Sequence, residues 1–263
     1  AVGNNATSNE SVLYFSNLTN SSINNVDLTR TGGTQYGQGI YVANGLAAYP
    51  FSITNCAVGN RRTGIYINGG RNYTVQNNTL TGSGNNFNEP ALYLNSLTVN
   101  SSLLINNNTF GGANFNTGIR VENTSDLLIS DGTVSGTHIG VTTANGLGNA
   151  TGYALYLANL TRTKVQNMDL SFTTTTRTGT GIQVTTNSGA TAQVEMKSLI
   201  VKNRVDGINI ASGANHSVKC SDLSDNSDGL EVASGVTSFA CEQNSFVGNI
   251  GFAINSAATI TAE

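Results

Sequence analysis

The chain of 263 residues is poor in charge, has two prolines and has no tryptophan. Asp, Glu, Lys and Arg together make up 10% of the residues, and the formal net charge is -3. A nucleic-acid-binding surface needs clustered Lys and Arg, so this composition argues against one. No run of about 18 apolar residues occurs, which argues against a membrane-spanning helix.

Cysteine and histidine are also scarce, which limits metal and redox chemistry. The three cysteines, Cys56, Cys220 and Cys241, are an odd number and do not form a disulfide framework. Cys220 and Cys241 lie about one repeat apart, so a disulfide and two small buried side chains both fit the spacing. His138 and His216 are isolated, and no zinc-ligand cluster, Ser-His-Asp arrangement or phosphate-binding loop can be assembled. We therefore expect no cofactor.

Asparagine, threonine, serine and glycine take the place of the missing charge. This uncharged polar bias and the low lysine content suit a secreted protein that acts outside the cell or at its surface. The chain begins Ala1-Val2-Gly3 without Met, which we interpret as a mature end after signal-peptide removal or as a trimmed start. Glycosylation acceptors of the type Asn-X-Ser/Thr include Asn5, Asn17, Asn72, Asn100, Asn149 and Asn215. With so much Asn, Ser and Thr, nearly as many are expected by chance.

A short motif, Gly64-Ile65-Tyr66-Ile67-Asn68-Gly69, recurs along the whole chain. Its alternating apolar residues indicate a strand with one buried face. The copies follow one another at steps of 22 to 36 residues, a period typical of solenoids and other repeat proteins. The first core positions of the other copies are Leu13, Ile40, Leu92, Ile119, Leu155, Ile182, Ile208, Leu230 and Phe252.

Each repeat contains two further apolar segments, such as Tyr73-Thr74-Val75 and a third one ending at Leu80. Two residues after the second segment stands a polar residue, usually Asn. We expect it to turn the chain in the left-handed conformation and to bond its equivalent one coil away. This predicted ladder comprises Asn25, Asn55, Asn77, Asn107, Asp131 and Asn167. Three short strands per repeat without a helical pattern predict a parallel β-helix with stacked coils.

In these repeats and this Asn column the chain resembles the right-handed parallel β-helix superfamily, often called pectin-lyase-like. The resemblance runs from about Ser11 to Ile260. It implies an all-β, single-domain, right-handed parallel β-helix of about nine to ten turns over residues 11–263, preceded by a polar extension at residues 1–10. No capping helix is evident. The superfamily includes lyases, hydrolases, epimerases, tailspikes, adhesins and structural proteins, so the resemblance leaves function open.

The middle residue of each first segment should point outward. Five of the first six members of that column are tyrosine: Tyr14, Tyr41, Tyr66, Tyr93 and Tyr156. An exposed aromatic row is typical of a surface that binds sugar rings or a protein partner. The alternative is purely structural, because tyrosine favours strands and stacks well on its own copies.

Acidic residues gather late in the chain, where Asp206 and Asp228 occupy equivalent places in adjacent repeats. With Glu231, and with Arg120 from an earlier repeat, they are the candidates for catalysis if the protein is an enzyme. Paired carboxylates suit glycoside hydrolysis, and oxygen ligands suit Ca²⁺. The simpler interpretation is that Asp before Gly caps a turn and stays solvated. The motifs expected of pectate lyases and polygalacturonases are missing.

These patterns favour a secreted structural or adhesive β-solenoid. Strand-like sequence continues almost to the last residue, so we expect self-association, with subunits stacked head to tail in an extracellular fibre. The alternative is a polysaccharide-acting enzyme: a lyase, a glycoside hydrolase or a tailspike-like depolymerase. A polysaccharide or cell-surface glycan is a further candidate partner.

Overall fold

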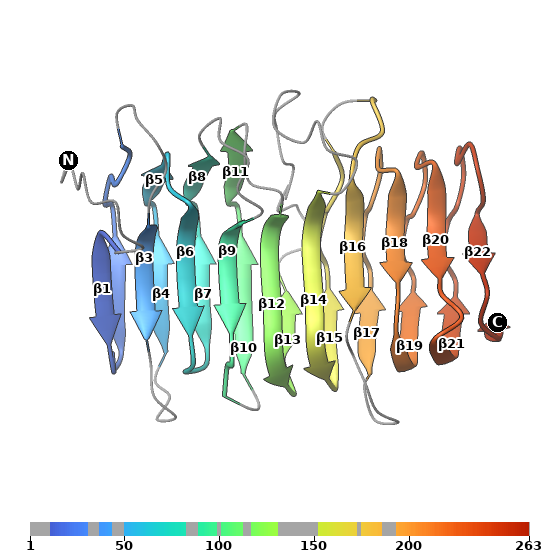
Figure 1. Ribbon diagram of the computed structural model, residues 1–263, viewed down its shortest axis with the longest axis horizontal. Helices are drawn as coiled ribbons and strands as arrows, with labels where there is room; N and C mark the ends of the chain where they lie inside the picture. The colour runs from blue at the N-terminus through green and yellow to red at the C-terminus, as the bar shows by residue number, and fades with distance from the viewer. Residues whose placement is uncertain are drawn as a thin grey trace.

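The computed structural model describes residues 11–30, 37–43, 50–82, 89–98, 101–112, 117–130, 152–172, 175–185 and 193–262. These residues form two ten-stranded sheets and one three-stranded sheet, which run along the length of the molecule (Figure 1). The pairings are parallel throughout, and β1 and β22 lie at opposite ends. None of the described segments forms a helix long and apolar enough to cross a membrane.

The first sheet contains the recurring motif. Its strands, in spatial order, are β1 (Leu13–Ser16), β3 (Gln38–Ala43), β6 (Thr63–Asn68), β9 (Pro90–Asn95), β12 (Thr117–Ser125), β14 (Tyr153–Thr161), β16 (Thr180–Thr185), β18 (Asp206–Ile210), β20 (Asp228–Val232) and β22 (Ile254–Ser256). Spatial order equals repeat order, so each coil of the chain contributes one strand.

The second sheet is built in the same way from the segment that follows. Its strands are β2 (Ser21–Asn24), β4 (Phe51–Thr54), β7 (Tyr73–Gln76), β10 (Ser102–Asn106), β13 (Leu128–Ser130), β15 (Thr163–Gln166), β17 (Val194–Lys197), β19 (Gly213–Lys219), β21 (Val236–Glu242) and β23 (Ile260–Ala262). The third sheet contains β5 (Ala57–Gly59), β8 (Thr79–Gly82) and β11 (Thr109–Gly112). In later coils single bridges, such as Asp169 to Ile200, take its place.

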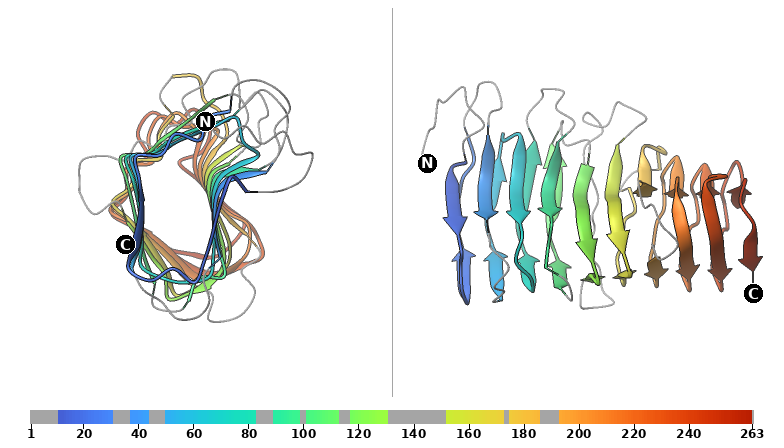
Figure 2. Two further views of the ribbon diagram at one scale, coloured as in Figure 1. Left: turned by 90° about the vertical axis from the view of Figure 1, so that its left-hand side faces the viewer. Right: turned by 60° about the horizontal axis from the view of Figure 1, so that its bottom comes forward.

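The core lies inside the coil and is continuous from one end to the other. Ile65 pairs in register with Ile40 and Leu92, and Ile67 with Val42 and Leu94. All of these side chains are fully buried. Seen along the axis, the coils superpose around a common interior (Figure 2). Each coil therefore buries its apolar residues only because the next coil covers them.

The predicted all-β parallel solenoid is confirmed, with ten strands in each main sheet and no helix in the described residues. Its right-handedness stays a prediction. The proposed extension at residues 1–10 lies outside the described residues, as do His138 and Asp131.

Left-handed asparagines form the turn after the second sheet. Asn25, Asn55, Asn77, Asn107 and Asn167 have φ angles of 58°, 55°, 56°, 50° and 55°. The amide of Asn107 donates to the Asn77 Oδ1 at 2.8 Å, as a ladder requires. Asn55, however, donates to Asn24 rather than to Asn25. This column lies largely on the outside of the coil, where the side chains of Asn25, Asn55, Asn77 and Asn107 are exposed.

A second asparagine ladder lies inside the coil, one residue further along. Asn78 and Asn108 are 1% and 3% exposed. Asn78 Nδ2 donates to Asn108 Oδ1 at 2.9 Å and to the Ile53 carbonyl at 2.9 Å. Asn78 Oδ1 accepts from the Cys56 backbone N–H at 2.9 Å. The inner ladder therefore satisfies backbone groups that the tight turn removes from the sheets.

The suggested disulfide between Cys220 and Cys241 is wrong, because both cysteines are free. Val218, not Cys220, is the register partner of Cys241. Cys220 lies two residues after Val218, in the left-handed turn that follows β19. Its side chain is exposed and that of Cys241 is buried, so the two thiols face opposite sides of the coil wall.

Apolar side chains are exposed in the segment between β21 and β22. Val247, Ile250 and Phe252 are 74%, 72% and 60% exposed. Ile254 in β22 and Ile260 in β23 pack against the core and stay partly exposed. Within the described residues, β22 and β23 each have one neighbouring strand.

Candidate binding surface

The outer face of the first sheet carries the predicted tyrosine row. Tyr14, Tyr41, Tyr66 and Tyr93 are register partners on the consecutive strands β1, β3, β6 and β9. Tyr41 and Tyr66 stack with ring centroids 4.8 Å apart and planes at 6°, and Tyr66 and Tyr93 with 4.7 Å and 11°. Tyr14 meets Tyr41 edge-on at 5.3 Å. The strand spacing thus brings the rings to stacking distance.

This stacking determines which parts of the tyrosine rings a ligand can contact. The faces of Tyr41, Tyr66 and Tyr93 lie against one another, so sugar rings cannot stack on the middle of the row. All three side chains are partly exposed, so a ligand can approach only their edges. Tyr14 differs, because it ends the row and is 60% exposed.

Arg120 continues the row in β12, between two tyrosines. Its guanidinium carbon lies 5.4 Å from the centroid of Tyr93 and 5.0 Å from that of Tyr156, which are cation–π distances. Arg120 also donates to Glu122 Oε1 through Nε at 2.8 Å and through Nη2 at 2.5 Å. Tyr93 donates its hydroxyl to Glu122 Oε2 at 2.6 Å. Glu122 therefore links Tyr93 and Arg120 through hydrogen bonds from both residues.

The network keeps the phenols protonated and Arg120 charged. Burial, reinforced by the hydrogen bond to Glu122, raises the pKa of Tyr93 well above its usual value. Burial also raises the pKa of Tyr66 and of Tyr156. Burial lowers the pKa of Arg120, but the hydrogen bond and charge of Glu122 outweigh it and leave the pKa raised. A tyrosinate base at neutral pH is therefore excluded at Tyr93.

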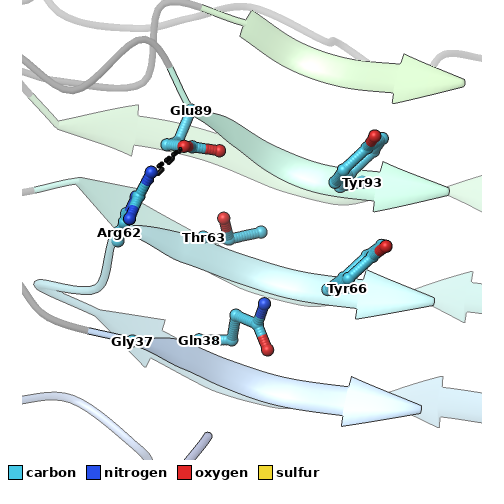
Figure 3. Close-up of a pocket in the computed structure, with 7 residues that line it drawn as sticks. All are labelled: Gly37, Gln38, Arg62, Thr63, Tyr66, Glu89 and Tyr93. Carbon is cyan, nitrogen blue, oxygen red and sulfur yellow. Dashed lines mark hydrogen bonds and ion pairs between the residues drawn. The ribbon is translucent and has the colours of Figure 1, made fainter. Parts of the chain in front are cut away.

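A polar pocket of about 210 Å³ opens beside the row, at the start of the strands. The residues that line it lie at the start of β3 (Gly37, Gln38), at β6 (Arg62, Thr63, Tyr66) and at β9 (Glu89, Tyr93). Arg62 Nη2 and Nε donate to Glu89 Oε1 at 2.6 and 3.0 Å. Figure 3 shows this ion pair at one side of the pocket and the two tyrosines at the other. The pocket therefore joins fixed donors and acceptors to the aromatic row.

Past Tyr156 the row becomes polar and then acidic. Gln183 donates to Asn209 Oδ1 at 3.3 Å, and Asn209 donates to Glu231 Oε2 at 2.6 Å. Asp206 and Asp228 are register partners at the start of β18 and β20. The three predicted acids are therefore brought together. Arg120 is not with them, because β14 and β16 separate β12 from β18.

The acids are held by the fold. Asp206 Oδ2 accepts from the Thr180 hydroxyl at 3.2 Å, and Asp228 Oδ1 accepts from the Phe252 N–H at 2.6 Å. Burial, then the charge of Asp228, raises the pKa of Asp206. Burial, then the charges of Asp206 and Asp228, raises the pKa of Glu231. Among the described residues no group of three or more His, Cys, Asp or Glu could hold a metal ion.

Replacing Asp206 by asparagine is expected to raise the melting temperature by a few degrees at neutral pH. The pKa of Asp206 is raised in the folded protein, so the folded state holds this proton more tightly than the unfolded state. Stability from this group is present below the unfolded pKa and is lost as the pH rises through the folded pKa. Asparagine removes that loss, so the gain should vanish at acidic pH, below the ordinary pKa of aspartate.

Thermal unfolding at both pH values checks this, with Asp27→Asn as the control. Asp27 accepts from the Thr29 N–H at 2.9 Å, and this bond lowers its pKa. Its replacement should therefore not raise the melting temperature at neutral pH. A gain of equal size from both substitutions would contradict the role given to the burial of Asp206.

The pocket and the inner asparagine ladder were not predicted from the sequence. The repeated tetrapeptides Asn77-Asn78-Thr79-Leu80 and Asn107-Asn108-Thr109-Phe110 contain the signal for the ladder. His216, predicted to be isolated, is buried and accepts from the Val194 N–H at 3.0 Å. It is a structural residue.

No protein-family model and no curated protein sequence matches the chain. Among solved structures, the chain is similar to the catalytic domain of a GH87 alpha-1,3-glucanase variant in complex with nigerose, with 13% identity and a TM-score of 0.22. The match covers 94% of this chain and 64% of that one, so the chain spans about 64% of the length of that domain. A TM-score this low carries no argument, and the solenoid fold is established by its own strand pairing.

Proposed function

We propose that the chain is a secreted adhesive or structural β-solenoid that binds an extended glycan along the outer face of its first sheet. The observation that supports this most directly is the straight row from Tyr14 to Tyr156 with the polar pocket beside it. Neutral saccharides are recognised by planar groups that hydrogen-bond neighbouring hydroxyls, and by aromatic side chains. Gln38, Arg62 and Glu89 supply the planar groups. The tyrosine hydroxyls supply donors and acceptors at the ring edges.

The binding mode follows from the ring geometry. Because the middle rings stack on one another, the glycan would lie across their edges and bond the hydroxyls of Tyr41 and Tyr66. The coils repeat at the spacing of β-strands, so equivalent groups recur regularly along the axis. A polymer with repeated hydroxyls therefore fits this face better than a single small molecule.

The triple variant Tyr41→Phe, Tyr66→Phe, Tyr93→Phe is expected to weaken glycan binding at least about tenfold, the loss of roughly one good hydrogen bond. Phenylalanine preserves the stack and removes the hydroxyls, together with the hydrogen bond from Tyr93 to Glu122. Calorimetry or co-sedimentation with a panel of neutral and uronate-containing polysaccharides would measure the effect. The double variant Ser52→Ala, Thr74→Val on the second sheet is the matched control and should bind normally. Absence of binding by the wild-type protein to every polymer in the panel would refute the proposal.

A polysaccharide-acting enzyme is the second candidate, favoured by the raised pKa of Asp206 and of Glu231. A raised pKa favours the protonated carboxyl group, which is the form that acts as a general acid. The same incubations should be assayed for reducing and unsaturated sugar ends. If the wild-type protein releases such ends and Asp206→Asn or Glu231→Gln does not, the protein is an enzyme rather than an adhesive solenoid.

Assembly head to tail into an extracellular fibre remains part of the structural proposal. The exposed apolar side chains of Val247, Ile250 and Phe252 in the last coil support it, as does the partly uncovered core beside them. Such surfaces favour association. Electron microscopy of the purified protein should show filaments with a repeat of one molecule, and discrete particles at all concentrations would count against assembly.

A further inference from the structure

The tyrosine row is also a stack of oxidisable rings. Phenols are among the side chains most easily oxidised by one electron, and close stacking lets the electron vacancy pass between rings. Tyr14, Tyr41, Tyr66 and Tyr93 follow one another at centroid distances of 5.3, 4.8 and 4.7 Å. Arg120 ends this series, because a guanidinium is not oxidised under such conditions.

The inner end of the stack has its own proton acceptor. A phenol that loses an electron becomes a strong acid and must release its proton. The Tyr93 hydroxyl already donates to Glu122 Oε2 at 2.6 Å, within reach for direct transfer. Glu122 is 9% exposed and is fixed by Arg120, so oxidation at Tyr93 needs no water molecule to take the proton. The stack can thus hold an oxidising equivalent inside the molecule.

The outer end of the stack is open. Tyr14 is 60% exposed, whereas Tyr41, Tyr66 and Tyr93 are only partly exposed. Tyr14 meets Tyr41 edge-on, at an interplanar angle of 73°. Coupling of two tyrosyl radicals needs the ring carbons beside the hydroxyl to approach each other. Among the stacked rings, Tyr14 meets this requirement best.

We propose that Tyr14 is a dityrosine cross-linking site and that Tyr41, Tyr66 and Tyr93 form a relay that delivers oxidising equivalents to it. The oxidant is hydrogen peroxide activated by a haem peroxidase. Tyr14 on each of two copies loses one electron and one proton, and a carbon–carbon bond forms between the rings beside their hydroxyls. One peroxide is reduced to two water molecules. C–C coupling is irreversible, so it consumes each radical that reaches Tyr14. The radical is therefore drawn from the relay to Tyr14 even when its equilibrium population there is low.

Coupling through the same residue on both copies makes a two-fold dimer that closes on itself. The cross-link therefore joins two solenoids at the coils that contain β1 and does not lengthen a chain of subunits. It does not depend on whether the face binds a glycan.

The test treats the full chain with a haem peroxidase and hydrogen peroxide. Covalent dimers are measured on denaturing gels and by dityrosine fluorescence, and the linked peptides by mass spectrometry. The wild-type protein should form dimers joined from Tyr14 to Tyr14. Tyr14→Phe should lower the dimer yield at least about tenfold. Cross-links mapped mainly to other tyrosines, or an undiminished yield in Tyr14→Phe, would overturn the site.

The relay is tested by Tyr41→Phe, which preserves the stacked ring but separates Tyr14 from Tyr66 and Tyr93. The dimer yield should fall severalfold although Tyr14 is present. Tyr156 lies beyond Arg120 in the row, so Tyr156→Phe should leave the dimer yield unchanged. A wild-type yield from Tyr41→Phe would overturn the relay, because Tyr14 would then be oxidised directly. Circular dichroism of each variant confirms that the fold is retained.

Discussion

Replacing Asn78 by alanine is expected to lower the free energy of unfolding by about 4 kcal/mol. The Cys56 N–H would lose its acceptor in a place closed to water, and the Ile53 carbonyl would lose a donor. Asn108 Oδ1 would lose one of its two donors and keep the backbone N–H of residue 78. Each buried group left in this way costs about 1–3 kcal/mol. A small cavity adds to the loss.

Urea-induced unfolding measures this effect, and Asn77→Gly is the matched control. Asn77 is the neighbouring residue, is exposed, and has a φ of 56° that glycine adopts without strain. Its replacement should change stability by no more than about 1 kcal/mol. If Asn78→Ala costs as little as Asn77→Gly, the inner ladder does not stabilise the coil.

Replacing Gly207 by alanine is expected to destabilise the protein by about 3 kcal/mol. A Cβ atom at this position would lie 2.4 Å from the Gly229 carbonyl oxygen and 2.9 Å from Asn226 Nδ2. Asn226 is fully buried and cannot give way, since its amide donates to the Val201 carbonyl at 2.8 Å and accepts from the Arg204 N–H at 2.9 Å. Relief of the clash would require the adjacent coils to separate.

The control for this substitution is Gly235→Ala. There the nearest atom to the added Cβ is the Ala211 carbonyl oxygen at 3.7 Å, an ordinary contact. Its effect should stay within about 0.5 kcal/mol. Thermal or urea unfolding of both variants gives the comparison, and equal losses would show that close coil contact at Gly207 is not the cause.

The fold was largely predictable because the same pattern of alternating apolar residues recurs in every coil. Alternating pairs such as Ile65 and Ile67 recur often enough to define the first sheet, its register and the inward face. The inner ladder was not predicted, because the sequence pattern pointed to the turn residue one position earlier. Sequence spacing identified Asn77 as the turn residue, but the left-handed turn there directs the next side chain, Asn78, into the core. Other coils place Cys56 or Met168 at this inner position, which hides the pattern.

The surface was predictable only in part. The alternation that buries Ile65 also places Tyr66 outside, but it does not say that the rings stack and cover one another's faces. The Asp-Gly repeat brought Asp206 and Asp228 together, whereas Arg120 belongs to a coil three strands away and pairs with Glu122 instead. The pocket depends on how Arg62 and Glu89 meet at the entrance to β6 and β9 after loops of variable length, which periodicity does not describe.

Because successive coils pair in the same register, the solenoid can become longer or shorter only by whole coils. Excising the coil formed by β6, β7 and β8 would bring β3 against β9, where Val42 would meet Leu94 in the interior. Tyr41 would meet Tyr93 outside, so the ring stack would close one member shorter. Gene duplication or deletion in steps of one coil can therefore lengthen or shorten the tyrosine row without redesigning the core, whereas an insertion of a few residues can be absorbed only in the loops.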